Sequence, residues 1–122
     1  MPLFEIDLDE SYRPKRQQIS DAIHQAMIEG LSGSPTDRFQ VFRFHADNED
    51  LVFDPTHGGV DRKSIIWLRV AMNHKFDVAT KKGFYRKLAE GIDAIGLRHE
   101  DLLVSILEYD FDDVYAGKVR GD

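Results

Sequence analysis

Residues 64–72 read Ser64-Ile65-Ile66-Trp67-Leu68-Arg69-Val70-Ala71-Met72, an almost continuous apolar run. Runs of this kind are typical of strands that are buried on both faces. Residues 77–95 change to helical spacing, and Gly96 follows where this helix is expected to close. Residues 102–107 are again apolar and predict a further strand. Strand, helix and strand in this order form a βαβ unit, whose two strands run parallel.

The first part of the chain shows the same order of elements. Residues 2–8 alternate with a period of two, which predicts a strand with one apolar side. Residues 13–31 carry apolar side chains at steps of three and four and predict an amphipathic helix. Residues 38–45 predict the second strand of this unit.

Local signals add detail to the first half. Pro14 suits the first turn of the predicted helix, and Gly30 and Gly33 lie near its end, where glycine favours a left-handed cap. The polar run Asp47-Asn48-Glu49-Asp50 predicts a turn, and the apolar residues 51–53 predict a short additional strand.

The two units match at a spacing of about sixty residues. In this alignment Phe4 corresponds to Trp67, which we assign to the core. We therefore expect an α+β fold, with one domain over residues 1–122 and halves of about 1–62 and 63–122. The tandem βαβ repeat would form a four-stranded mixed sheet with two helices on one face. The other sheet face would be bare, and we expect further subunits to cover it.

The composition excludes several classes of protein. There is no cysteine, which excludes a disulfide framework, thiol catalysis and a cysteine-ligated metal site. The chain has 16 basic and 22 acidic side chains, a net charge of -6 and no basic stripe, so we expect no nucleic-acid partner. Its apolar runs are too short to cross a membrane and its start lacks the basic region of a signal peptide, so we expect a cytoplasmic protein without a membrane partner.

No motif in the chain predicts a metal or an organic cofactor. Glycine-rich phosphate loops and the GxSxG elbow are absent, and no two of the five histidines have the i, i+4 spacing of a helical ligand pair. We expect His24 at the surface or at the core boundary, and His99 in a solvated loop.

Pro2 is the residue with the most direct chemical meaning. Methionine is normally removed when a small residue such as proline follows it, and removal would leave a secondary amine at the start of the first strand. An exposed α-amino group titrates near about 7.7–8.0, and burial or nearby cations lower that pKa. A neutral amine near pH 7 can act as a general base, and its protonated form can act as an acid. The alternative is a proline that follows the initiator methionine without a catalytic role.

Several segments together resemble a known family. The segments are Met1-Pro2-Leu3, residues 35–41, Asp54-Pro55, Asp61-Arg62, Lys81, Tyr85-Arg86 and Leu107-Glu108. In their order and spacing the chain resembles the tautomerase superfamily, and most of all the branch that contains malonate semialdehyde decarboxylase. The resemblance implies tandem βαβ subunits, a homotrimer, a small anionic carbonyl substrate and catalysis by an amino-terminal proline.

The resemblance also implies roles for individual residues. Pro2 matches the catalytic proline, and Asp37 matches an aspartate that assists it. Asp37 also suits a turn or cap after Pro35 on physical grounds alone. The related decarboxylase has two arginines after the third strand, separated by one residue, which hold the substrate.

This chain departs from the family pattern at two places. His74 and Phe76 stand at the arginine positions with Lys75 between them, and neither histidine nor lysine reproduces the bidentate clamp of arginine. We assign substrate binding to His74 and Lys75, with an exposed loop as the alternative. Near the C-terminus Tyr115 is the one aromatic residue left where relatives have an aromatic pocket wall, so we add it to the binding residues.

Arg43 and Arg69 lie within predicted strands and offer a second way to hold an anion. A charged group in an apolar strand needs a partner or solvent, so structural ion pairs are the alternative for both.

Three hypotheses for function follow. In the first, Pro2 is the general base of a tautomerase that acts on small 2-oxo acids or their enols. In the second, a protonated Pro2 supports decarboxylation or hydration of a small 3-oxo acid such as malonate semialdehyde. In the third, the protein is a non-catalytic trimeric binding protein, which the missing arginine pair would favour.

Overall fold

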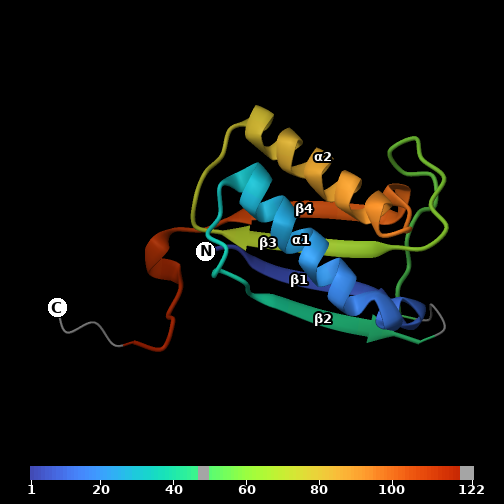
Figure 1. Ribbon diagram of the computed structural model, residues 1–122, viewed down its shortest axis with the longest axis horizontal. Coiled ribbons are helices and arrows are strands. Elements are labelled where there is room, and N and C mark those ends of the chain that lie inside the picture. The colour runs from blue at the N-terminus through green and yellow to red at the C-terminus, as the bar shows by residue number, and fades with distance from the viewer. Residues whose placement is uncertain (47–49, 119–122) are drawn as a thin grey trace.

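The computed structural model describes residues 1–46 and 50–118, and Figure 1 shows two helices packed on one sheet. The strands are β1 (Leu3–Asp9), β2 (Gln40–His45), β3 (Ile66–Met72) and β4 (Leu102–Glu108). The helices are α1 (Arg16–Leu31) and α2 (Val78–Ala94), and short 3-10 segments lie at Glu10–Lys15, His99–Asp101 and Phe111–Asp113.

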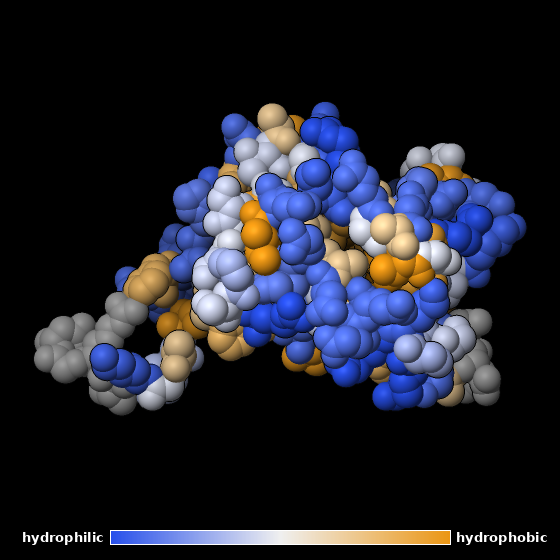
Figure 2. Space-filling model, in the orientation of Figure 1, coloured by the Kyte–Doolittle hydropathy of each residue, from blue (hydrophilic) through white to orange (hydrophobic). Residues whose placement is uncertain are grey.

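The sheet is mixed and has the order β2-β1-β3-β4. β1 runs parallel to β2, β3 runs parallel to β4, and the central pair β1 and β3 is antiparallel. Both helices cover the same face and contact each other (Figure 1). This confirms the predicted α+β fold of a four-stranded sheet under two helices. Figure 2 shows that the helix-bearing face is largely hydrophilic, as expected of a face that meets solvent.

The register of the strands corrects the repeat alignment. The first residues of β2 and β4 are 62 positions apart, and so are the first residues of α1 and α2. At this spacing Ile66, which lies opposite Leu102, is the counterpart of Phe4, which lies opposite Gln40, and the predicted match with Trp67 is wrong by one residue. Because a slip of one residue moves a strand side chain to the other face, Trp67 lies on the face away from the helices, beside Asp7.

One face of β3 is buried by the helices and the other is only partly covered. Ile66, Leu68, Val70 and Met72 are almost fully buried in the core. The alternate side chains of Trp67, Arg69 and Ala71 are half-buried. A single chain therefore buries only one face of this strand. The other face belongs to the side of the sheet that we expect further subunits to cover.

The ends of α1 differ from the expectation in two ways. Pro14 lies in the 3-10 segment before α1 rather than in its first turn. The left-handed residue that ends α1 is Ser32, with φ of 55°, and not Gly30 or Gly33. Gly30 has a packing role instead, because an added Cβ would lie 2.8 Å from the Cα atom of Phe84 in α2. The second helix closes at Gly96, with φ of 81°, as predicted.

The connections around the core bring further corrections. Residues 51–53 form no strand, although Leu51 is buried, and the predicted turn at 47–50 lies largely outside the described residues. His24 is 5% exposed, so its predicted place at the surface or boundary is wrong. The Arg62 guanidinium donates to the carbonyls of Asp54 and His57 and closes the loop that leads to β3.

Candidate active site

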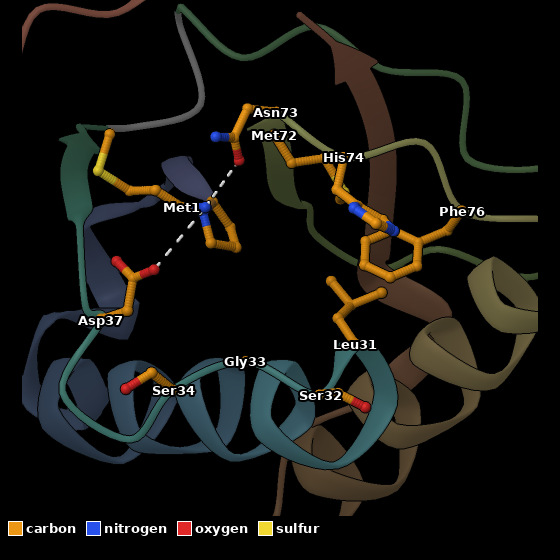
Figure 3. A pocket seen from close by; sticks show the side chains of 11 residues that line it. Met1, Leu31, Ser32, Gly33, Ser34, Asp37, Met72, Asn73, His74 and Phe76 are labelled. Atoms are coloured by element: carbon orange, nitrogen blue, oxygen red, sulfur yellow. Dashed lines mark hydrogen bonds and ion pairs between the residues drawn. The ribbon is translucent and has the colours of Figure 1, made fainter. Parts of the chain in front are cut away.

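A cavity of about 490 Å³ opens where β1 begins and β3 ends. Figure 3 shows its walls, which come from the chain start, the segment after α1 and the segment after β3. The described residues that line it are Met1, Pro2, Leu31, Ser32, Gly33, Ser34, Asp37, Met72, Asn73, His74 and Phe76. Pro2 is buried at this cavity, directly before the central strand β1.

The amino terminus is held at the cavity by two polar side chains. The Met1 ammonium donates to the Oδ1 atom of Asn73 at 2.8 Å, and it lies 3.8 Å from the Oδ2 atom of Asp37. Figure 3 shows Asp37 and Asn73 on either side of this nitrogen. The Met1 carbonyl oxygen accepts a hydrogen bond of 2.8 Å from the Tyr109 hydroxyl. Both polar groups of Met1 are therefore bound by residues distant in the sequence.

Tyr109 reaches the chain start because its backbone extends the sheet. It follows β4 directly, and its N–H donates to the Met72 carbonyl at the end of β3 at 2.9 Å. Partial burial raises the pKa of Tyr109, and the negative charge of Asp37 raises it further. The phenol therefore stays protonated and acts as a donor at neutral pH.

Asp37 is fixed by the segment that follows α1. The Asp37 N–H donates to the Ser34 carbonyl at 3.0 Å, which closes a turn. The buried His24 ring lies below this turn, with its Nε2 atom 2.8 Å from the Pro35 carbonyl oxygen. Since a carbonyl only accepts, Nε2 is the donor and His24 holds the turn from the core side. The turn role considered for Asp37 is thus compatible with its place in the cavity wall.

The remaining predicted binding residues lie apart from one another. His74 lines the cavity and its ring packs on Phe76, with ring centroids 4.4 Å apart; Figure 3 shows both across the cavity from Asp37. Lys75 and Tyr115 are exposed and are not among the described residues that line the cavity. The structure thus brings together Pro2, Asp37 and His74. No lysine or arginine is among the lining residues of the described chain.

Arg43 and Arg69 form structural ion pairs on the sheet face away from the helices. The Arg43 guanidinium donates to Asp7 at 3.0 Å and to Glu5 at 2.9 Å, and Arg69 donates to Asp7. His45 also contacts Asp7, at 2.8 Å. Burial alone would raise the pKa of Asp7, but hydrogen bonds from Arg43, His45 and Arg69 outweigh it and lower this pKa to about 2.

Two further features of the described residues bear on function. Asp93, His99 and Glu100 bring possible ligand atoms within 4.8 Å of one another. They lie at the C-terminal end of α2, whereas cavity residues 73–76 precede the start of α2. His99 bonds Asp93 there, at 2.8 Å. Within residues 1–46 and 50–118, no helix is long and apolar enough to span a membrane.

Sequence reasoning missed Asn73 and Tyr109. Neither belongs to a motif, and both contact Met1 across more than seventy positions of the chain. The signal available was positional. Asn73 directly follows β3, which ends beside the start of β1, and Tyr109 directly follows β4, which ends beside the end of β3.

The cavity is sized for a small molecule and is lined by an amino terminus, a carboxylate, an amide and an imidazole. Tyr109 is not among the described lining residues, but its phenol reaches the cavity wall through its hydrogen bond to Met1. These lining groups suit proton transfer, because an amine and a carboxylate can exchange protons.

Comparison with known proteins gives the family. The family model described as "Tautomerase enzyme" matches residues 37–113. The protein is 30% identical to the probable tautomerase YrdN of Bacillus subtilis (strain 168), covering 90% of this chain and 86% of the relative. It is 32% identical to the probable tautomerase YusQ of the same strain, covering 74% of this chain and 72% of the relative. The chain belongs to the tautomerase family.

Solved structures agree with this assignment. The FG41 malonate semialdehyde decarboxylase inhibited by 3-bromopropiolate has 29% identity and a TM-score of 0.86, with 95% of this chain and 89% of that chain covered. A second malonate semialdehyde decarboxylase has 25% identity and a TM-score of 0.85, with 97% and 92% covered. The resemblance stated from the sequence is thereby confirmed.

Proposed function

We propose that the protein is a tautomerase of small 2-oxo acids or their enols, with Pro2 as the general base after removal of Met1. The observation that carries the proposal is the position of Pro2, which is buried at the cavity between residues that bind the chain's present amino terminus. Asp37 and Asn73 already bind an ammonium group there. They are suited to hold the Pro2 amine once it becomes the terminus.

The mechanism follows from this placement. In enolisation, the neutral Pro2 nitrogen takes a proton from the carbon next to the carbonyl group. The C–H electron pair forms the carbon–carbon double bond, the carbonyl π pair moves to oxygen, and a proton from solvent completes the enol. General base catalysis of this kind contributes about 10²- to 10⁴-fold in rate. Asp37 favours the protonated state that Pro2 reaches, because opposite charges at short distance stabilise each other.

The test is a ketonisation assay with phenylenolpyruvate on protein whose intact mass shows that Met1 is absent. Pro2→Ala is a matched variant, because alanine is also small enough for methionine removal and only the secondary amine is lost. We expect kcat to fall about 100-fold in Pro2→Ala and about 10-fold or more in Asp37→Asn. Equal rates for the three proteins would remove Pro2 and Asp37 from the mechanism.

Decarboxylation or hydration of a small 3-oxo acid is the second candidate. The likeness to two malonate semialdehyde decarboxylases favours it. Against it, His74 and Phe76 stand where that branch has its arginine pair, and the described lining residues include no guanidinium group. Carbon dioxide release from malonate semialdehyde at a rate above that of phenylenolpyruvate ketonisation would favour this candidate over the tautomerase.

A trimeric binding protein without catalysis is the third candidate, and retention of Met1 would favour it. With Met1 in place, the proline nitrogen is part of a peptide bond and carries no basic lone pair. Intact mass of the protein isolated from its natural source separates the cases. If Met1 is kept quantitatively, the proline-base mechanism is wrong.

A further inference from the structure

We propose that Tyr109 is a catalytic residue of this site, whose hydroxyl donates to the carbonyl or enolate oxygen of the substrate. The inference deepens the proposed function and rests on it. Removal of Met1 frees the groups that bind it.

Met1 marks the place that the substrate takes. Its carbonyl carbon is bonded to the Pro2 nitrogen, so its carbonyl oxygen lies one atom beyond the nitrogen that becomes the base. The Tyr109 hydroxyl donates to this oxygen at 2.8 Å. In the mature protein a substrate carbonyl oxygen close to the Pro2 nitrogen occupies the same position. Among the described residues, the Tyr109 hydroxyl has no hydrogen-bond acceptor other than this Met1 oxygen.

Tyr109 also supplies a hydrogen-bond donor that the missing arginine pair would otherwise provide. Negative charge that develops on the enolate oxygen needs a donor, and the lining residues offer no lysine or arginine. The Tyr109 backbone is fixed by its bond to Met72 at the end of β3, so the donor is preorganised. Burial and the Asp37 charge raise its pKa, which keeps the proton on the phenol at neutral pH.

In ketonisation, the C2=C3 π electron pair of the enol takes a proton from the protonated Pro2 amine and forms a C3–H bond. The enol O–H bond breaks, its electron pair forms the C=O bond, and its proton passes to water. Pro2 is then reprotonated from water. Tyr109 keeps its proton throughout and donates a hydrogen bond to the same oxygen.

The variant Tyr109→Phe tests the proposal in mature protein. The hydroxyl's partner leaves with Met1, so the substitution removes no protein hydrogen bond from the mature chain. We expect kcat for phenylenolpyruvate to fall about 100-fold with KM changed less than about threefold, because loss of one oxyanion donor acts mainly in the transition state. Tyr85→Phe, on the outer side of α2, is the control and is expected to keep wild-type rates.

Thermal unfolding provides a second, activity-independent measurement. Tyr109→Phe is expected to lower Tm when Met1 is retained, because the bond to the Met1 carbonyl is lost, and to leave Tm unchanged in the mature protein. A kcat within threefold of wild type, or a raised KM with unchanged kcat, would overturn the role of Tyr109. Pro2→Ala separates this failure from failure of the function: if it loses activity while Tyr109→Phe does not, only the inference on Tyr109 is wrong.

Discussion

His74 and Phe76 replace the two arginines that would bind a substrate carboxylate in the related decarboxylases. Both line the cavity at positions where the resemblance implies arginines. A guanidinium gives two parallel hydrogen bonds to a carboxylate, which neither an imidazole nor a phenyl ring provides. The aromatic contact between His74 and Phe76 instead presents a ring surface, which suits a substrate with an apolar or aromatic end.

The double variant H74R/F76R is therefore expected to gain decarboxylase activity. The restored pair would bind and polarise a 3-oxo carboxylate, so carbon dioxide release from malonate semialdehyde should rise at least about tenfold, roughly the effect of one charge-assisted hydrogen bond. Lys82→Arg, an exposed change on α2, is the control for a guanidinium placed away from the cavity. A double variant no faster than wild type would show that more than these two positions separates the activities.

The ion pairs of Asp7 are expected to make the stability of the fold depend on pH. Its pKa is lowered to about 2 in the folded protein, below the usual value of 3.8, so the folded state favours the ionised form. The stabilisation is therefore complete above about pH 5 and is lost as the pH falls towards 2. Since Arg43 and Arg69 are partly exposed, we expect Asp7→Asn to cost about 1 to 2 kcal/mol at pH 7.

Urea unfolding of wild type and Asp7→Asn at several pH values checks this expectation. The difference in unfolding free energy should shrink steadily between pH 5 and pH 2, where the wild-type carboxylate becomes protonated. Asp54→Asn, an exposed loop change whose carboxylate accepts from the Thr56 N–H and hydroxyl, is the comparison. A difference that stays constant across this range would contradict the assigned linkage.

At the scale of elements, the close approach of α1 and α2 depends on Gly30. A Cβ atom there would lie 2.8 Å from the Phe84 Cα atom, which is backbone and cannot move without moving α2. We expect Gly30→Ala to destabilise the protein by about 1 to 3 kcal/mol through overpacking. The measurement is the urea midpoint at constant m-value.

Gly83→Ala is the matched control for this prediction. Gly83 lies inside α2, where an added Cβ would meet only the flexible Arg86 side chain at 3.8 Å. We expect a gain of about 0.5 to 1 kcal/mol, because alanine is the better helix former. If both variants gain stability, the helix contact at Gly30 is looser than its geometry indicates.

The same elements show what sequence patterns predict and what they do not. The strands and helices were predictable because period two and period 3.6 are set by burial of one face, as in β3 and α2. The match of Phe4 with Trp67 failed because sequence similarity between short apolar strands does not resolve a shift of one residue. The left-handed Ser32 was not predictable, since glycines stand on both sides of it.

The candidate site was predictable only in part for a related reason. Pro2 and Asp37 carry chemistry that a sequence reveals, and His74 stands at a position that the resemblance marks. Asn73 and Tyr109 become visible only when the antiparallel pairing of β1 and β3 and the parallel pairing of β3 and β4 place three chain segments side by side. Long-range contacts of this kind leave no local pattern.

For the whole molecule, the sheet face away from the helices is the face that no helix of this chain covers. Its centre holds the Asp7 cluster with Arg43 and Arg69, and its margins expose Val41 and Leu107, which are 51% and 69% accessible. A charged centre whose members already satisfy one another and an apolar margin suit contact with other subunits. The trimeric tautomerase structures among the fold neighbours, at 14% and 15% identity, share the fold with this chain.

We expect a homotrimer in solution, with a sedimentation mass of roughly three times 14.0 kDa, and we expect Leu107→Glu to weaken it. A carboxylate at this position would be buried without a partner on assembly, which costs several kcal/mol for each subunit contact. Val78→Glu, a similarly exposed apolar residue at the start of α2 on the opposite face, should leave the trimer intact.

A stable wild-type monomer at micromolar concentration would contradict the trimer, and equal association of both variants would place the interface elsewhere. If instead Leu107→Glu yields a folded monomer that still ketonises phenylenolpyruvate, the Pro2 site needs no residue from a second subunit.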